Sequence, residues 1–299
     1  MKFLASDDER TKVQVMSGEK MDFLPSRSFH ITVDKQKVLE TGTVKPEDAD
    51  EIADTVKFSI GKSYITKSEM AILNIIAANN WERPIYIDHS LLYANSIFFL
   101  DYLQLEGLAY RFVPIETKGG GMNRGRIDAD ILYDNVMNKF VWGNVNDPDV
   151  YLDEYNKKAI NIIQARYMFA RLAEALINKG DNKRAVEVLD KLFEIFPNKK
   201  MPLTYDSFLA VELYYRTGET EKANQLVQVL SKNSFDMLEY YFSLPDRFAV
   251  AIEEEQNREM SLINNMVILT NRYDQEALNK EINNKLDEII KGLESKMDS

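Results

Sequence analysis

The chain carries one helical phrase twice, 38 residues apart. Gly180 is followed by an acidic residue and then by Ala185, and Gly218 is followed by an acidic residue and then by Ala223. Around each glycine, large and small apolar residues recur at intervals of three and four, which is the spacing of one helix face. The phrase therefore predicts two pairs of antiparallel helices, each pair reversing direction at its glycine.

The predicted hairpins span about 157–197 and 204–235, and they resemble tetratricopeptide repeats. Such repeats usually bind or scaffold other molecules and seldom catalyse. Two clear repeats are too few for a free-standing solenoid, which needs three or more stacked units. The pattern predicts an interaction module whose hairpins are supported by flanking helices and by an α/β layer.

The composition is that of a soluble globular protein with room for two domains. The chain has 299 residues, of which 45% are hydrophobic and 28% are charged. A formal net charge of -11 argues against nucleic-acid binding, which needs a clustered basic face. The absence of cysteine excludes thiol catalysis, zinc–thiolate sites and disulfides. No apolar run approaches the roughly 18 residues that a membrane-spanning helix requires.

The order of predicted elements indicates an α+β fold with an α/β domain at 1–118, a glycine-rich loop at 119–127 and a helical domain at 128–299. Strands are predicted at 12–16, 20–24, 28–33, 55–60, 84–87 and 108–115. Pro46 marks a short helix. Thr66 and Glu69 form a capping box that opens a longer helix. A further helix is predicted within 90–104.

In the helical domain, helices are predicted at 128–140 and 155–178, the second of which is the first helix of the first hairpin. Asp246 is the expected cap of a long helix, and Asp274 is expected to open the last one. The apolar residues of that last helix recur every three or four positions along one face. This face needs a partner surface.

Ligand contacts are predicted on the first helix of the second hairpin, toward the side on which helical repeats usually hold an extended peptide. The residues expected there are Tyr205, Phe208, Glu212, Tyr215 and Arg216. Tyrosine and phenylalanine offer ring faces for contact, and the charged residues offer hydrogen bonds.

A second candidate site lies in the α/β domain, at Asp88 and His89, where a strand ends. With glycines 119–121, these residues are expected to bind a small molecule such as a sugar or an anion, or else to be structural. Adjacent strand residues point to opposite faces, so the two do not form a dyad by themselves. No metal site is predicted, because Asp149 takes the glycine position of a calcium-binding loop and Pro148 a ligand position. No cofactor is predicted.

Three segments carry a wider resemblance: IIAANNWERPIY at 75–86, DYLQLEGLAYR at 101–111 and YDNVMNKF at 133–140. They resemble the C-terminal soluble region of a bacterial family of multi-pass membrane proteins, the domain of unknown function 2723 family. The N-terminal half of that family is similar to protein O-mannosyltransferases, which are GT-C glycosyltransferases. The resemblance implies an extracytoplasmic (periplasmic) location at the inner membrane. The membrane half holds the catalytic groups, so no catalytic residue is assigned here.

The leading hypothesis is a non-catalytic accessory module of a glycosyltransferase-like membrane protein. Its expected partners are the membrane-embedded half of the same protein and a protein or glycan ligand, with no nucleic acid. Two alternatives stay open. One is the small-molecule site near Asp88 and His89, and the other is a purely structural or oligomerisation domain that uses the last helix.

Overall fold

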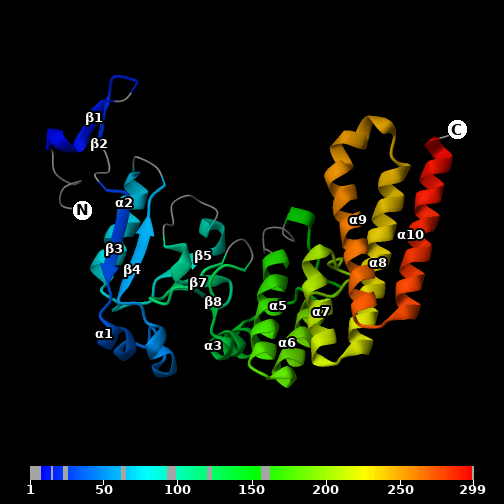
Figure 1. Ribbon diagram of the computed structural model, residues 1–299, viewed down its shortest axis with the longest axis horizontal. Helices are drawn as coiled ribbons and strands as arrows, with labels where there is room; N and C mark the ends of the chain where they lie inside the picture. Colours follow the sequence, from blue (N-terminus) through cyan, green and yellow to red (C-terminus); the bar gives the residue numbers. More distant parts are fainter. Residues whose placement is uncertain are drawn as a thin grey trace. The chain divides into compact units, whose positions relative to one another are not determined.

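The chain forms two compact units, Met1–Leu132 and Tyr133–Ser299 (Figure 1). A computed structural model describes residues 8–14, 16–22, 26–61, 65–92, 99–119, 123–155 and 162–297. The first unit mixes helices and strands, whereas the described part of the second unit is helical. The predicted α+β class, with a mixed region before an all-helical region, is confirmed.

The strands of the first unit form three small sheets. Their bounds are β1 Lys12–Gln14, β2 Lys20–Asp22, β3 Ser28–Thr32, β4 Thr55–Ser59, β5 Tyr86–Asp88, β6 Leu103–Leu105, β7 Ala109–Phe112 and β8 Arg126–Ile127. β1 pairs with β2, β3 pairs with β4, and the largest sheet has the order β5-β7-β6-β8. β6 and β8 are parallel, and the other pairs are antiparallel. Of the predicted strand segments, residues 15, 23 and 24 lie outside the described residues.

The helix predicted within 90–104 is wrong in the part that the structure describes. Residues 93–98 lie outside it, and the flanking segments His89–Leu92 and Leu100–Tyr102 are short 3-10 helices. The last part is strand β6, in which Leu103 lies opposite Phe112 of β7 and is completely buried. β6 is a central strand that pairs with β7 and β8, and this pairing outweighs the local preference of its residues for helix.

The helices of the first unit begin with the short α1, Lys35–Glu40, which the sequence analysis missed. The helix expected at Pro46 is a 3-10 helix, Pro46–Glu51. The predicted capping box is confirmed: α2 spans Lys67–Asn79, and the Thr66 side chain accepts a hydrogen bond from the Glu69 N–H. After α2, the buried Trp81 stacks on Phe112 of β7 with ring centroids 5.1 Å apart.

The second unit is a succession of helices. Their bounds are α3 Ala129–Asp134 (which begins in the first unit) with a π-helical turn Asn135–Lys139, α5 Ile162–Asn178, α6 Asn182–Ile195, α7 Phe208–Thr217, α8 Thr220–Ser243, α9 Ala249–Arg272 and α10 Glu276–Met297. α7 is preceded by the 3-10 helix Tyr205–Ser207, and α9 by the 3-10 helix Asp246–Phe248. Of the helix predicted at 155–178, residues 156–161 lie outside the described residues.

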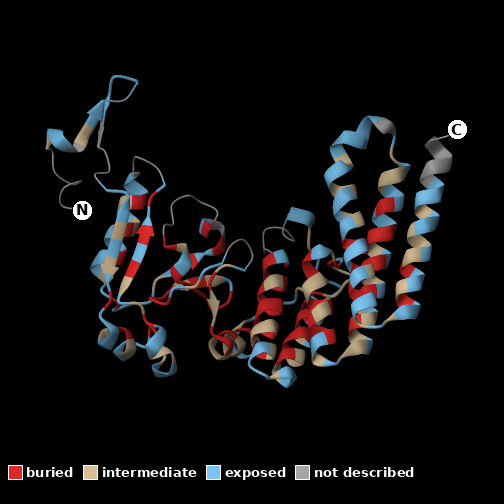
Figure 2. Cartoon of the chain, in the orientation of Figure 1, coloured by how far each residue is buried: buried red, intermediate tan, exposed pale blue. Residues whose placement is uncertain are grey.

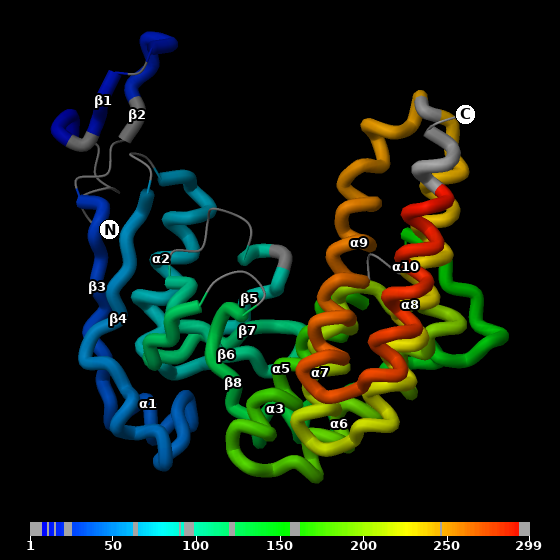
Figure 3. The backbone as a smooth tube through the Cα atoms, turned by 45° about the vertical axis from the view of Figure 1, so that its right-hand side comes forward, coloured from blue at the N-terminus to red at the C-terminus, as the bar shows by residue number. Residues whose placement is uncertain are grey.

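These helices pair into three antiparallel hairpins, α5–α6, α7–α8 and α9–α10 (Figure 3). Successive hairpins touch, since α7 packs on both α5 and α6 while α8 packs on both α9 and α10. Gly180 and Gly218 reverse the first two hairpins, as the repeat predicts, and Asp274 lies at the reversal of the third. The facing sides of α5, α6, α7 and α8 are the most continuously buried part of this unit (Figure 2).

Candidate functional site

A buried ion pair fixes the segment that leads into α7. The Arg166 guanidinium of α5 lies 3.1 Å from an Asp206 carboxylate oxygen, and both side chains are almost wholly buried. Arg166 also donates to the carbonyls of Met201 and Pro202, at 2.6 and 3.2 Å. The Thr204 hydroxyl donates to Asp206 at 2.8 Å. The segment before α7 is therefore tied to α5 by several charge-assisted hydrogen bonds, which are among the stronger kind.

This anchored segment forms one wall of a cleft. Tyr205 and Phe208 stand on that wall, and the opposite wall belongs to α9. The cleft has a volume of about 500 Å³, and its lining is completed by Arg258, Ser261, Leu262 and Asn265. Two of the predicted ligand residues are thus brought together. Their partners on α9 were missed, because nothing in the sequence links residues about 50 positions apart.

The polar groups at the mouth of the cleft are available for a ligand. Tyr205 is 40% exposed, and the Arg258 guanidinium carbon lies 5.7 Å from its ring centroid, within the range of a cation–π contact. Within the described ranges, the side chains of Arg258, Ser261 and Asn265 make no hydrogen bond or ion pair. A ring face, a guanidinium, a hydroxyl and an amide therefore face one open space.

The other three predicted ligand residues bind neighbouring helices instead. Glu212 pairs with Arg272 of α9 at 2.8 Å. Arg216 donates to Asn178 of α5 at 2.8 Å and lies 3.4 Å from the Glu174 carboxylate. These contacts join α7 to α9 on one side and to α5 on the other.

Tyr215 is buried in the turn region of the last two hairpins. Its ring stacks on Tyr273 with centroids 4.5 Å apart, and its hydroxyl donates to Asn224 at 2.6 Å. Burial, and to a smaller extent the neighbouring Tyr273, raises the pKa of Tyr215 to about 12. Tyr215 has a packing role in this arrangement.

Asp88 and His89 lie in the first unit. Asp88 ends β5 opposite Ala109, and His89 is 9% exposed with its ring stacked on Tyr110 at 6.1 Å. Burial lowers the pKa of His89, although the Asp88 carboxylate opposes this shift. The imidazole thus packs against Tyr110 of β7 at the start of the 3-10 helix His89–Leu92, where burial disfavours its charged form. Of the glycines predicted to join it, Gly119 is described, and 120 and 121 lie outside the described residues.

A polar cluster on the largest sheet had no sequence signal. One row of directly opposed residues crosses its four strands: Tyr86, Arg111, Gln104 and Arg126. On the same face Glu106 accepts hydrogen bonds from the Tyr86 hydroxyl at 2.6 Å and from the Gln104 amide at 2.7 Å. Burial, followed by the hydrogen bond to Glu106 and its charge, raises the pKa of Tyr86 to about 12.

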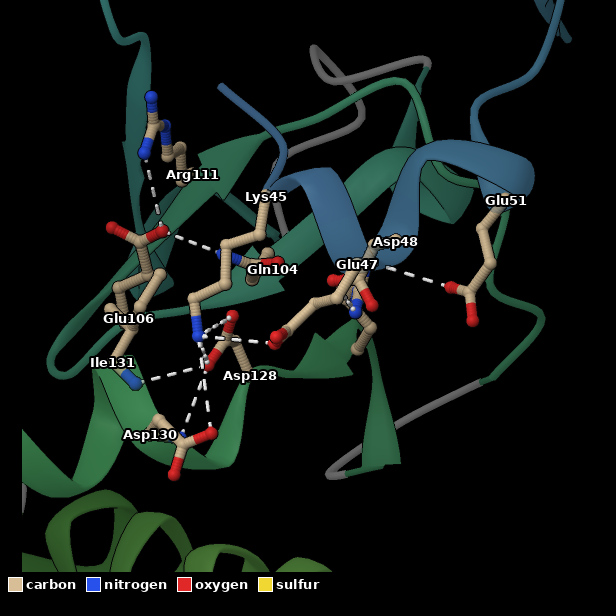
Figure 4. Close-up of polar contacts among 11 residues, drawn as sticks. Lys45, Glu47, Asp48, Glu51, Gln104, Glu106, Arg111, Asp128, Asp130 and Ile131 are labelled. Carbon is tan, nitrogen blue, oxygen red and sulfur yellow. Dashed lines mark hydrogen bonds and ion pairs between the residues drawn. The ribbon is translucent and has the colours of Figure 1, made fainter. Parts of the chain in front are cut away.

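The segment around Lys45 covers this polar row (Figure 4). Lys45 pairs with Asp128 at 2.9 Å, and Arg126 pairs with Asp48 at 2.7 Å. Asp128 also accepts from the N–H groups of Asp130 and Ile131, where α3 begins. The cluster therefore holds the sheet, the covering segment and the start of α3 together.

The described residues contain no group of three or more His, Cys, Asp or Glu placed to hold a metal ion. None of the helices in this part of the chain is long and apolar enough to cross a membrane.

Comparison with known proteins gives one match. Residues 1–131 match the family model described as TMEM260-associated domain 2. No curated protein and no solved structure matches the chain. The match thus covers the first unit almost completely and associates it with a membrane protein.

Proposed function

We propose that this chain is a non-catalytic interaction module of a glycosyltransferase-like membrane protein, in which the helical hairpins bind a protein or a glycan. The match of residues 1–131 to a TMEM260-associated domain supports the link to a membrane protein. The resemblance to proteins with a GT-C-like membrane half supports the glycosyltransferase context. In this proposal the hairpins act as tetratricopeptide-like repeats.

The cleft between the Tyr205 segment and α9 is the observation that carries the binding role. A buried ion pair between Arg166 and Asp206 positions one wall, and the polar side chains of the other wall make no hydrogen bond or ion pair within the described residues, although Arg258 lies over the Tyr205 ring. An anchored wall, an exposed ring and a few polar groups around one hollow are features that ligand sites share. Around the polar row of the first unit, in contrast, Lys45 is paired with Asp128 and Arg126 with Asp48.

The module is proposed to lie on the extracytoplasmic side of the inner membrane, next to the membrane-embedded half of the same protein. In the full-length protein, a topology reporter inserted directly after Ser299 of this chain tests this location. Alkaline phosphatase, which folds only outside the cytoplasm, is expected to be active there. An inactive phosphatase together with a fluorescent cytoplasmic reporter at the same position would contradict the proposal.

The non-catalytic role is tested with the purified chain and a lipid-linked sugar donor. We expect no donor turnover by the chain alone, and we expect the chain to co-purify with a separately expressed membrane half. Turnover of the donor by the isolated chain would overturn the proposal.

A further inference from the structure

The cleft beside Tyr205 is bounded along the helices, which limits the size of its ligand. One helical turn beyond Phe208, the ion pair between Glu212 and Arg272 bridges α7 and α9. An extended peptide that followed the cleft between α7 and α9 would meet this ion pair. The polar groups that can bind a ligand therefore lie on α9 opposite the start of α7. The cleft there, of about 500 Å³, accepts a compact ligand.

The groups in the cleft are suited to a ligand with many hydroxyls. Asn265 and Ser261 each offer a hydrogen-bond donor and an acceptor, and Arg258 offers donors only. A sugar hydroxyl also both donates and accepts, so it can satisfy mixed partners of this kind. The three residues are spaced three and four positions apart on α9, which places them on one helix face.

The rings in the cleft are suited to the apolar side of a sugar. Tyr205 is 40% exposed, and Phe208 lies beside it at the start of α7. An aromatic face supplies apolar contact area with little loss of side-chain freedom, and the tyrosine hydroxyl leaves one end polar. The apolar C–H face of a pyranose ring matches this surface.

We propose that the cleft lined by Tyr205, Phe208, Arg258, Ser261, Leu262 and Asn265 is a carbohydrate site that binds a mono- or disaccharide unit. A pyranose ring packs against Tyr205, beside the Arg258 guanidinium that lies over that ring, and its hydroxyls bind Arg258, Ser261 and Asn265. This inference rests on the proposed function and narrows its ligand from protein or glycan to glycan.

The test uses the full chain and a panel of methyl glycosides of glucose, galactose, mannose and N-acetylglucosamine, with the matching disaccharides. Saturation-transfer NMR detects binding, and calorimetric titration gives the Kd. We expect at least one saccharide to bind. Asn265→Ala is expected to weaken it about tenfold, the effect of losing one hydrogen-bonded partner. Tyr205→Ala is expected to weaken it at least as much, because it removes the stacking face.

A matched control is Tyr240→Ala, which removes another exposed tyrosine, on α8, outside the cleft. We expect this variant to bind as the unchanged chain does. Circular dichroism checks that each variant keeps its helix content. Tyr205→Phe, which keeps the ring, should retain most of the affinity and serves if Tyr205→Ala does not fold.

Two outcomes would overturn the carbohydrate assignment. One is that no saccharide of the panel binds, and the other is that binding survives both Tyr205→Ala and Asn265→Ala. Binding of unstructured peptides that depends on the same two residues, without saccharide binding, would also overturn it. Peptide binding of this kind would contradict the carbohydrate site but agree with the proposed interaction role. Donor turnover by the isolated chain would contradict the non-catalytic role but would not affect the carbohydrate site.

Discussion

Asp274 occupies in the third hairpin the position that Gly218 holds in the second. Both residues have a left-handed backbone, with φ of 56° and 85°. The N–H of each donates to the carbonyl three residues back, and the next N–H donates to the carbonyl five residues back. The same two hydrogen bonds close the turn at Gly180. The three hairpins therefore share one turn, although only two of them have a glycine in it.

Asp274→Gly is expected to stabilise the chain. A residue with a side chain is strained in the left-handed region, and glycine is not. Part of this gain is offset by the greater freedom of glycine in the unfolded chain, so we expect an increase of about 0.5 kcal/mol in the free energy of unfolding. Urea denaturation followed by circular dichroism measures it.

The reverse change at the equivalent position is the control. Gly218→Ala is expected to lower the free energy of unfolding by about 1 kcal/mol. A Cβ atom at Gly218 would have no neighbour within 4 Å, so the cost is conformational. If Asp274→Gly destabilised the chain as well, the strain assigned to Asp274 would be disproved.

The third hairpin shows why the repeat was only partly predictable. Ala185 and Ala223 follow their glycines at the same offset, and Asn279 follows Asp274 at that offset. Asn279 is accommodated because its amide donates to the Val267 carbonyl and the Thr270 hydroxyl. In the third hairpin the glycine and the alanine are thus both replaced by polar residues, and the side chain of Asn279 finds local partners. The helices between Gly218 and Asp274, α8 and α9, are also long, so the 38-residue interval is not kept.

Removing the Arg166 side chain is expected to destabilise the second unit strongly. Arg166→Met leaves the carboxylate of Asp206 buried without its counter-charge, and it removes the bonds to two carbonyls. Breaking a buried pair in this way typically costs about 3–5 kcal/mol. Urea denaturation followed by helix ellipticity reports on this unit.

The double variant Arg166→Met with Asp206→Asn tests the electrostatic cause. It removes the isolated charge, so it should be less destabilised than the sum of the two single variants. Strictly additive losses would show that the two residues act independently, in conflict with the ion pair.

Thr66→Ala tests the capping box of α2. The Thr66 side chain accepts from the Glu69 N–H, and the Glu69 carboxylate accepts from the Thr66 N–H at 2.8 Å. Loss of the cap is expected to cost about 1 kcal/mol of unfolding free energy. Thr66→Ser keeps the hydroxyl and is the matched control, with a cost of a few tenths of a kcal/mol at most. Equal losses in the two variants would contradict a capping role.

Two of the six residues that line the cleft could be predicted from the sequence for a physical reason. Tyr205 and Phe208 are aromatic residues at the start of a helix, and the hairpin repeat placed them on the binding side. Glu212 and Arg216 are predicted on the same side, but Glu212 is paired with Arg272, and Arg216 binds Asn178 and Glu174. Which polar residues bind a ligand and which bind a neighbouring helix depends on packing between helices distant in the chain. Local spacing does not contain that information.

The alkaline titration of Tyr86 tests the polar row of the first unit. Burial, and then the hydrogen bond to Glu106 and its charge, raises the pKa of Tyr86 from 10.0 to about 12. The folded chain therefore holds this proton at pH values where the unfolded chain has lost it. The stability that Tyr86 contributes is fully present below pH 10 and is lost as the pH rises through about 12.

The ultraviolet absorbance of tyrosinate, taken as the difference between the unchanged chain and Tyr86→Phe, isolates this group. We expect the difference to show ionisation near pH 12 rather than near pH 10. In a Glu106→Gln background the negative charge is gone while the burial remains, so the pKa of Tyr86 should fall only part of the way toward 10.0. If Glu106→Gln left the pKa of Tyr86 unchanged, Glu106 would not hold the Tyr86 proton. The polar row would then be joined through Gln104 and the two arginines alone.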